Sequence, residues 1–150
     1  MTTAVTSAES NAKVIGDLYA AFGRGDLPAI LDKLHDDVSW DADWADNYAQ
    51  RGDGLDFFRP RRGPAGAAEF FAVLSTYTFN DFQMKTIIAG DHYVVAVVTI
   101  DVSTPIGGRV QDEELHLWTF DTAGKIVAFR HYLDTAKHLA AGRGEDTTMT

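Results

Sequence analysis

The chain has 150 residues, a length typical of one domain, and a domain of this size buries roughly 68–70% of the surface of its unfolded chain. Only 13 Lys and Arg face 22 Asp and Glu, and the formal net charge of −9 argues against binding nucleic acid through clustered cations. The chain has no cysteine, which excludes disulfides, a thiolate nucleophile and a cysteine-ligated metal. No apolar run approaches the roughly 18 residues of a membrane span, and no secretory signal pattern opens the sequence. We therefore expect a cytoplasmic protein with neither a nucleic-acid nor a membrane partner.

Helical spacing of apolar residues predicts three helices in the first half of the chain. The first ends at Gly23, and its buried face comprises Val14, Ile15, Leu18, Tyr19 and Phe22. Asp26 is expected to cap a short second helix. Pro64 suits the first turn of a third helix, whose apolar stripe comprises Ala67, Phe70, Phe71 and Leu74.

Alternating polarity predicts the strands. The first runs over residues 38–44, so that Trp40 and Trp44 share one face while Asp41 and Asp43 point outward. Four later runs are separated by glycine-containing turns and predict an antiparallel meander over residues 82–89, 93–103, 109–120 and 125–133.

The remaining segments complete a single domain over residues 1–150. Residues 45–63 lack periodicity and predict a long loop, a feature of functional lids or partly disordered segments. Asp134 is expected to cap a last short helix, and residues 1–6 and 142–150 are expected to be mobile tails. Helices followed by antiparallel strands indicate an α+β fold, with helices packed on one side of a strongly bent sheet. The open mouth of such a cone is a natural place for a small-molecule pocket.

The last two predicted strands carry polar side chains among residues that otherwise look like core. With the turn at Thr122-Ala123-Gly124, alternation places His116 opposite Arg130. One face then holds Glu114, His116, Trp118 and Phe120 with Ala128, Arg130 and Tyr132, and the other holds Leu115, Leu117 and Thr119 with Val127, Phe129, His131 and Leu133. We expect the face with Glu114, His116 and Arg130 to line the cavity.

Each polar candidate on this hairpin has two interpretations. His116 beside Trp118 is a candidate general base, and the alternative is a hydrogen-bonded core histidine. Arg130 is a candidate for orienting a carboxylate, an enolate or a water, and the alternative is a buried ion pair with Glu114. The histidine spacing predicts no metal site, and the residues predicted to lie in loops or on the surface are His35, His92 and His138.

Three segments resemble one protein family. They are LYAAFGRGDLPAILDKLHDDVSW near the start, RGPAGAAEFF at the third helix and TFDTAGKIVAFRHYLDT at the last hairpin. With the order of elements, they are similar to the SnoaL-like branch of the nuclear transport factor 2-like superfamily, from about Lys13 to Leu139. This resemblance implies a cystatin-like, nuclear transport factor 2-like cone, in which a mixed/antiparallel sheet wraps around an N-terminal helix pair and a third helix.

The resemblance is specific for fold and weak for function. The superfamily includes ketosteroid isomerases, polyketide cyclases, limonene epoxide hydrolases, dehydratases and binding proteins. In its cyclases an acid/base Asp on the last strand lies beside a His on the preceding strand; here His116 keeps the His position and Arg130 occupies the acid position. The epoxide hydrolases place a water with an Asp-Arg-Asp set, which Arg130 would imitate with Asp41, Asp43, Asp112 or Glu114.

Our hypothesis from the sequence is a cofactor-free small-molecule enzyme. His116, Arg130 and Glu114 would transfer protons or activate water on a hydrophobic substrate. The predicted pocket wall comprises Tyr19, Trp40, Trp44, Phe70, Trp118 and Tyr132. The alternative is a non-catalytic ligand-binding or interaction domain with the same cone. A homodimer is expected because the outer sheet face would carry apolar residues, namely Leu115, Leu117, Val127, Phe129 and Leu133.

Overall fold

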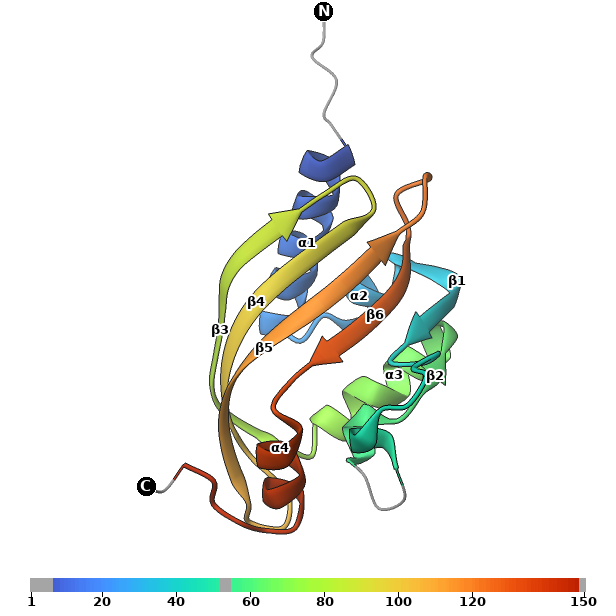
Figure 1. Cartoon of the computed structure of the whole chain (residues 1–150). Coiled ribbons are helices and arrows are strands. Elements are labelled where there is room, and N and C mark those ends of the chain that lie inside the picture. The colour runs from blue at the N-terminus through green and yellow to red at the C-terminus, as the bar shows by residue number, and fades with distance from the viewer. Residues whose placement is uncertain (1–6, 52–54, 149–150) are drawn as a thin grey trace, which may run out of the picture.

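The computed structural model describes residues 7–51 and 55–148 (Figure 1), so the tail predicted for residues 1–6 lies outside the described range. Within that range the helices are α1 (Ser7–Gly23), α2 (Leu27–Leu31), α3 (Gly63–Leu74) and α4 (Thr135–Gly142). The strands are β1 (Leu34–Trp40), β2 (Arg61–Arg62), β3 (Thr78–Ala89), β4 (Tyr93–Ser103), β5 (Arg109–Phe120) and β6 (Ile126–Tyr132). The predicted α+β class is confirmed. None of the described helices has the length and apolar character needed to cross a membrane.

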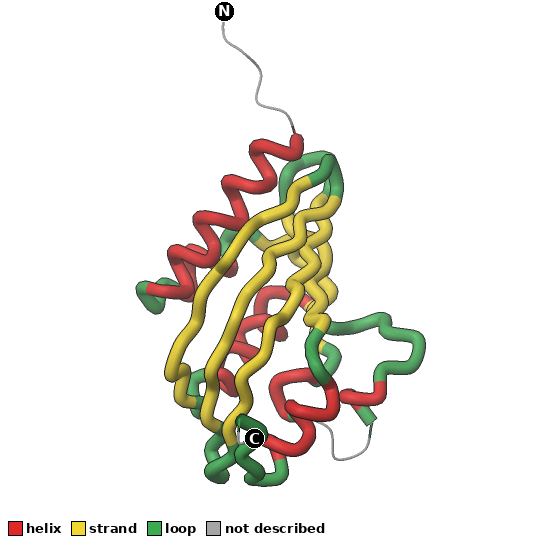
Figure 2. Tube along the Cα trace, turned by 60° about the vertical axis from the view of Figure 1, so that its left-hand side comes forward, coloured by secondary structure: helices red, strands yellow, loops and turns green. Residues whose placement is uncertain are grey.

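The described strands form one curled sheet in the order β2-β1-β6-β5-β4-β3. Neighbouring strands are antiparallel, except that β1 runs parallel to β6. Helix α1 packs against β3 and β4, and α3 packs against β1. Figures 1 and 2 show the sheet bent around these helices, with α4 beyond the end of β6. Side chains of the concave face therefore point into an interior enclosed by helices.

Local sequence signals set most element ends. The Asp26 carboxylate accepts a hydrogen bond from the backbone N–H of Ala29 at the start of α2, and Asp134 does the same for Lys137 in α4. Both predicted caps are confirmed. Strands β4 and β5 begin and end at the predicted residues, and alternate side chains along β4 are buried.

The first strand differs from its prediction. It spans Leu34–Trp40 and stops where Asp41, with φ of 51°, adopts the left-handed conformation. This break in alternation turns the Asp41 side chain inward, where it is 0% exposed, so the predicted outward orientation is wrong. Asp43 is exposed, as predicted.

The segment predicted as a long loop is largely packed. Its described part contains 3-10 helices at Tyr48–Gln50 and Asp56–Phe58 and the short strand β2. The side chains of Leu55, Phe57 and Phe58 are buried in the core. This part of the chain therefore closes one end of the cone.

The described part of the segment predicted as a tail from residue 142 onward contacts the rest of the domain. Helix α4 continues to Gly142, and the chain then pairs with the start of β5. Arg109 donates its backbone N–H to the carbonyl of Glu145, and Thr147 donates to the carbonyl of Arg109. Residues 149–150 lie outside the described range.

A β-bulge decides which side chains of the last hairpin point inward. Phe120 pairs with Ile126, as the predicted turn requires, but the register shifts between Thr119 and Phe120. Beyond this shift His116 pairs with His131, not with Arg130. One inserted residue exchanges the two faces of a strand, so the predicted assignment of residues 128–132 to faces is inverted.

Candidate functional site

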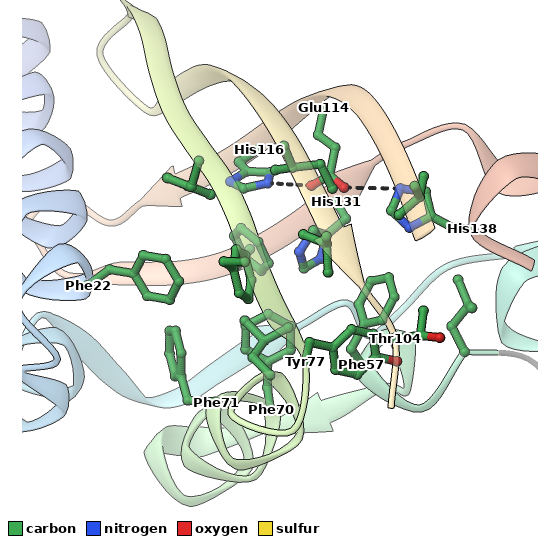
Figure 3. Close-up of a pocket in the computed structure, with 18 of the residues that line it drawn as sticks. Phe22, Phe57, Phe70, Phe71, Tyr77, Thr104, Glu114, His116, His131 and His138 are labelled. Atoms are coloured by element: carbon green, nitrogen blue, oxygen red, sulfur yellow. Dashed lines mark hydrogen bonds and ion pairs between the residues drawn. The ribbon is translucent and has the colours of Figure 1, made fainter. Parts of the chain in front are cut away.

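An aromatic cavity lies between the concave face of the sheet and helices α1 and α3 (Figure 3). The aromatic part of the wall comprises Tyr19, Phe22, Trp40, Phe57, Phe70, Phe71, Tyr77, Phe79, Phe82, Trp118 and Phe129. Four ionisable side chains interrupt this wall, namely Glu114, His116, His131 and His138.

The cavity contains part of the predicted site. Both Glu114 and His116 lie in its wall, 5% and 6% exposed. So do four of the predicted pocket residues, namely Tyr19, Trp40, Phe70 and Trp118. The alternating pattern of β5 was sufficient to place Glu114, His116 and Trp118 on one buried face.

The other three predicted site residues lie together outside the cavity wall. The Arg130 guanidinium is 4.5 Å from the centroid of the Trp44 ring and donates to the carbonyl of Asp43 at 3.0 Å. Tyr132 packs against Trp44 with ring centroids 5.1 Å apart and is 42% exposed. Their predicted placement in the cavity is wrong because the bulge turns Arg130 and Tyr132 to the outer face of β6.

A directed chain of hydrogen bonds leads from α1 to Glu114. The indole N–H of Trp118 donates to the Tyr19 hydroxyl at 3.2 Å, and the Tyr19 oxygen lies 2.6 Å from His116 Nδ1. His116 Nε2 lies 2.9 Å from a Glu114 oxygen. An ionised carboxylate can only accept, so Nε2 carries the hydrogen and donates to Glu114, while Nδ1 accepts from Tyr19. Both nitrogens of His116 are therefore occupied.

Glu114 also receives a hydrogen bond from α4. His138 Nε2 lies 3.2 Å from the second Glu114 oxygen and 3.0 Å from Asp112 Oδ2. His138 is 5% exposed, so its predicted surface position is wrong. Figure 3 shows Glu114 between the rings of His116 and His138, with both contacts drawn as dashed lines.

Burial and hydrogen bonding together set the charge states of this group. Burial would raise the pKa of Glu114, but hydrogen bonds from His116 and His138 hold it well below its usual range. Burial lowers the pKa of His116, and the bond to Glu114 offsets only part of that effect. Burial also lowers the pKa of His138, but the bonds to Asp112 and Glu114 outweigh it and raise the pKa to about 9. At neutral pH, His138 is the cation and His116 is neutral.

His131 is held by a separate carboxylate. Asp41 accepts two hydrogen bonds from it, one from the backbone N–H at 2.8 Å and one from ring Nδ1 at 2.6 Å. Two further hydrogen bonds hold the Asp41 backbone in place. The Asp41 N–H donates to the carbonyl of Phe129, and the Gln50 side-chain amide donates to the carbonyl of Asp41. His131 Nε2 has no hydrogen-bond partner among the described residues and belongs to a ring that lines the cavity.

Two overlapping sets of side chains are close enough to share a metal ion. They are Glu114 with His116 and His131, and Glu114 with Asp112 and His138, each with ligand atoms within 4.8 Å of one another. In the first set His116 Nε2 donates a hydrogen bond to Glu114, and in the second His138 Nε2 donates to Asp112 and Glu114. These hydrogen bonds account for the short contacts of Glu114 with His116 and His138, and we assign no metal to either set.

Sequence reasoning named Asp41 only as a possible partner of Arg130, and it did not place His131 or His138 in the site. A weak signal existed for Asp41, since Asp tolerates the left-handed conformation better than most residues. His138 precedes the buried Ala141 by three positions, which is the spacing of one helix face. No local signal marks the bulge that brings His131 into the cavity.

Comparison with known proteins agrees with this fold. The family model of the SnoaL-like domain matches residues 15–129. A nuclear transport factor 2-like protein from Burkholderia xenovorans LB400 has 20% sequence identity and a TM-score of 0.73, over 91% of this chain and 98% of its own. TerC, co-crystallised with polyporic acid, has 25% identity and a TM-score of 0.69 over 88% and 97%.

More distant likeness extends to an isomerase, the Δ5-3-ketosteroid isomerase from Mycobacterium sp., with 15% identity and a TM-score of 0.63 over 89% of this chain and 97% of its own. At that identity the likeness concerns the fold alone. No curated protein matches this chain in sequence. The resemblance seen in the three sequence segments is confirmed, and the chain belongs to the SnoaL-like domain family.

Proposed function

We propose that this protein is a small-molecule enzyme that transfers protons on a hydrophobic substrate, with His131 as its base. The observation that carries the proposal is the state of the His131 ring. Nδ1 donates to the Asp41 carboxylate, so in the neutral ring Nε2 keeps a lone pair in the cavity wall. A histidine oriented by a buried carboxylate is a recurrent form of general base. The base would accept its proton from the substrate or from a water beside it.

His116, the base expected from the sequence, fits a supporting role better. One of its nitrogens accepts from Tyr19 and the other donates to Glu114, so neither is free to receive a proton from a ligand. His116 and His131 have ring centroids 5.0 Å apart at an interplanar angle of 77°. In our proposal His116 holds Glu114 and packs beside the base.

The aromatic lining of the cavity favours an apolar ring compound as the substrate. Phe57, Phe70 and Phe129 all pack around His131, with ring centroids between 4.5 and 5.7 Å from its own. Such a wall buries the apolar surface of a ligand and excludes water that would compete for the base. A relative of 25% identity was co-crystallised with polyporic acid, which supports a small organic ligand here.

Proton exchange into a model ketone tests the proposal. The probe is 2-tetralone, a bicyclic ketone whose activated methylene protons exchange with D₂O and are followed by NMR. His131→Asn is the matched variant because the Asn amide nitrogen occupies the place of Nδ1 and can keep the bond to Asp41, while Nε2 is removed. We expect protein-catalysed exchange to fall by about 10²–10⁴-fold, the usual contribution of a general base. His92→Asn, on the exposed surface, serves as the control.

The outcome separates the two functions considered. If His131→Asn exchanges protons at the wild-type rate, His131 is not the base. Tight retention of the ketone with no exchange in the wild type would favour the alternative, a ligand-binding domain without catalysis.

We also propose a homodimer through the outer face of the sheet. This outer face keeps Leu115 and Leu117, as expected from the sequence, but the bulge buries Phe129, which was also expected there. It presents Leu115, 42% exposed, opposite Val97, and Leu117 opposite Val95. A contiguous apolar stripe of this kind is rarely left in water.

A further inference from the structure

The backbone of Asp41 only half follows the pairing of β1 with β6. Its N–H continues the parallel pairing by donating to the carbonyl of Phe129 at 2.8 Å. In a regular parallel ladder its carbonyl would accept the N–H of His131, two residues further along β6. A side-chain oxygen of Asp41, Oδ1, accepts that N–H instead at 2.8 Å, since the left-handed backbone with φ of 51° aims the carbonyl elsewhere. The carboxylate therefore takes the place of the carbonyl in the ladder.

This replacement brings the carboxylate to the His131 ring. Oδ1 of Asp41 holds the backbone N–H of His131, and Oδ2 accepts from ring Nδ1 at 2.6 Å. If the carbonyl returned to the ladder, it would take the backbone N–H, and the carboxylate would lose the bond that keeps it beside Nδ1. The tautomer of His131 thus depends on where the Asp41 carbonyl points.

Gln50 holds the Asp41 carbonyl out of the ladder. The side-chain amide nitrogen of Gln50 donates to that carbonyl at 2.6 Å. Within residues 7–51 and 55–148, no other donor bonds to it. Asp41 is 0% exposed, so water cannot replace this bond. Without Gln50 the carbonyl would stay unpaired in the interior, which is costly, or would return to the N–H of His131.

The backbone of Gln50 is anchored on both sides. Gln50 ends the 3-10 helix Tyr48–Gln50, and its N–H donates to the carbonyl of Asn47 at 3.0 Å. The Asn47 side chain caps this helix by accepting from the N–H of Ala49 at 3.0 Å. Ala49 is 0% exposed, and its carbonyl accepts from the N–H of Leu55 at 3.3 Å. The Gln50 amide therefore extends from a fixed position.

The same part of the chain packs against the ring that Asp41 orients. Phe57 and Phe58 belong to the next 3-10 helix, and their ring centroids lie 5.7 and 5.6 Å from that of His131. Figure 3 shows Phe57 and His131 in the wall of the cavity. The described residues between β1 and β2 therefore contact both members of the Asp41–His131 pair.

We propose that Gln50 is a positioning residue that selects the tautomer of His131. Its bond to the Asp41 carbonyl keeps the carboxylate on Nδ1, so that Nε2 stays free as the base. Gln50 touches neither the substrate nor the reacting atoms and acts through Asp41. The catalytic consequence rests on the proposed function, whereas the effect on the tautomer does not.

The ¹⁵N spectrum of the His131 ring tests the proposal without a substrate. Gln50→Met nearly keeps the length of the side chain and removes the donor. The neutral ring should carry its hydrogen on Nδ1 alone in the wild type, and Gln50→Met should show a mixture of the two tautomers. With 2-tetralone, kcat for exchange should fall about three- to tenfold, the effect of one hydrogen bond, while KM stays within about twofold. A Gln50→Met protein with the hydrogen on Nδ1 alone and an unchanged kcat would overturn the proposal.

A rescue variant and a control separate the hydrogen bond from general packing. In Gln50→His, ring Nε2–H lies about as far along the side chain as the Gln amide, so the single tautomer and kcat should return. A Gln50→His protein that folds but behaves like Gln50→Met would contradict the role of the bond. Gln83→Met is the control, since Gln83 bonds to Asp81 on the exposed surface and should leave both readouts unchanged.

The wild type alone decides the matter if Gln50→Met does not fold. One amide hydrogen of Gln50 should exchange with D₂O at least about tenfold more slowly than the amide hydrogens of Gln83, because it is bonded inside the protein. Equal exchange at the two glutamines would overturn the proposal.

These measurements distinguish the inference from the proposed function. A wild type that exchanges no protons into the ketone, with a tautomer that changes in Gln50→Met, would refute the catalytic proposal and leave the role of Gln50 standing. Exchange that His131→Asn abolishes, with a tautomer and kcat that ignore Gln50→Met, would do the reverse.

Discussion

The Asp41→Asn variant tests the pairing of Asp41 with His131, because it removes the negative charge of Asp41 while nearly keeping the size of its side chain. Asp41 accepts from both the backbone N–H and Nδ1 of His131, and one side-chain atom of Asn is a donor that would face one of these hydrogens. His131 can relieve the clash by moving its hydrogen from Nδ1 to Nε2, which destroys the free base. Losing a hydrogen bond to a charged acceptor should lower the free energy of unfolding by about 1–3 kcal/mol. Exchange into 2-tetralone should fall by about 10²–10⁴-fold, because the base would be present in the wrong tautomer.

The chain offers a close control for this substitution. Asp43 also has positive φ, 61° against 51° for Asp41, but its side chain is 59% exposed and paired with Arg62. Since Asn tolerates the left-handed conformation in both places, Asp43→Asn should leave exchange and stability nearly unchanged. ¹⁵N spectra of the His131 ring report the tautomer directly. An Asp41→Asn protein that keeps the Nδ1 hydrogen and exchanges within twofold of wild type would refute the reasoning.

Three further predictions concern stability and assembly. His138 has its pKa raised to about 9 from 6.5, so its contribution to stability is complete below pH 6.5 and is lost as the pH rises through 9. Urea unfolding should register a loss of roughly 3 kcal/mol across that window, and a His138→Gln protein with the same pH profile as wild type would contradict it. Gly108→Ala would place a Cβ 1.9 Å from the backbone oxygen of Ala141, so α4 must shift. We expect a loss of at least about 1–3 kcal/mol in thermal unfolding, and an unchanged midpoint would show that the contact relaxes freely. Leu115→Glu should convert the dimer into a monomer in sedimentation, whereas a monomeric wild type at micromolar concentration would remove the dimer proposal.

Much of the fold follows from signals within a few residues of each other. The caps at Asp26 and Asp134, the apolar stripe of α1 and the alternation along β4 and β5 are all local, so the sequence predicts these elements. The resemblance of three short segments was enough to predict the family and hence the bent sheet with its cavity. Glu114 and His116 were found for the same reason, since they alternate with exposed residues on one strand.

The chemistry of the cavity depended on contacts that no local pattern encodes. Side chains in a strand alternate with a period of two, so the one-residue bulge beside Phe120 exchanges Arg130 for His131 at the inner face. The hydrogen bond from Tyr19 to His116 joins residues 97 positions apart, and the one from His131 to Asp41 joins residues 90 apart. Local patterns and the family resemblance predict the fold, the family and an interior that holds His116 and Glu114. They do not predict which histidine keeps a free nitrogen, because that depends on which donors and acceptors the folded chain brings together.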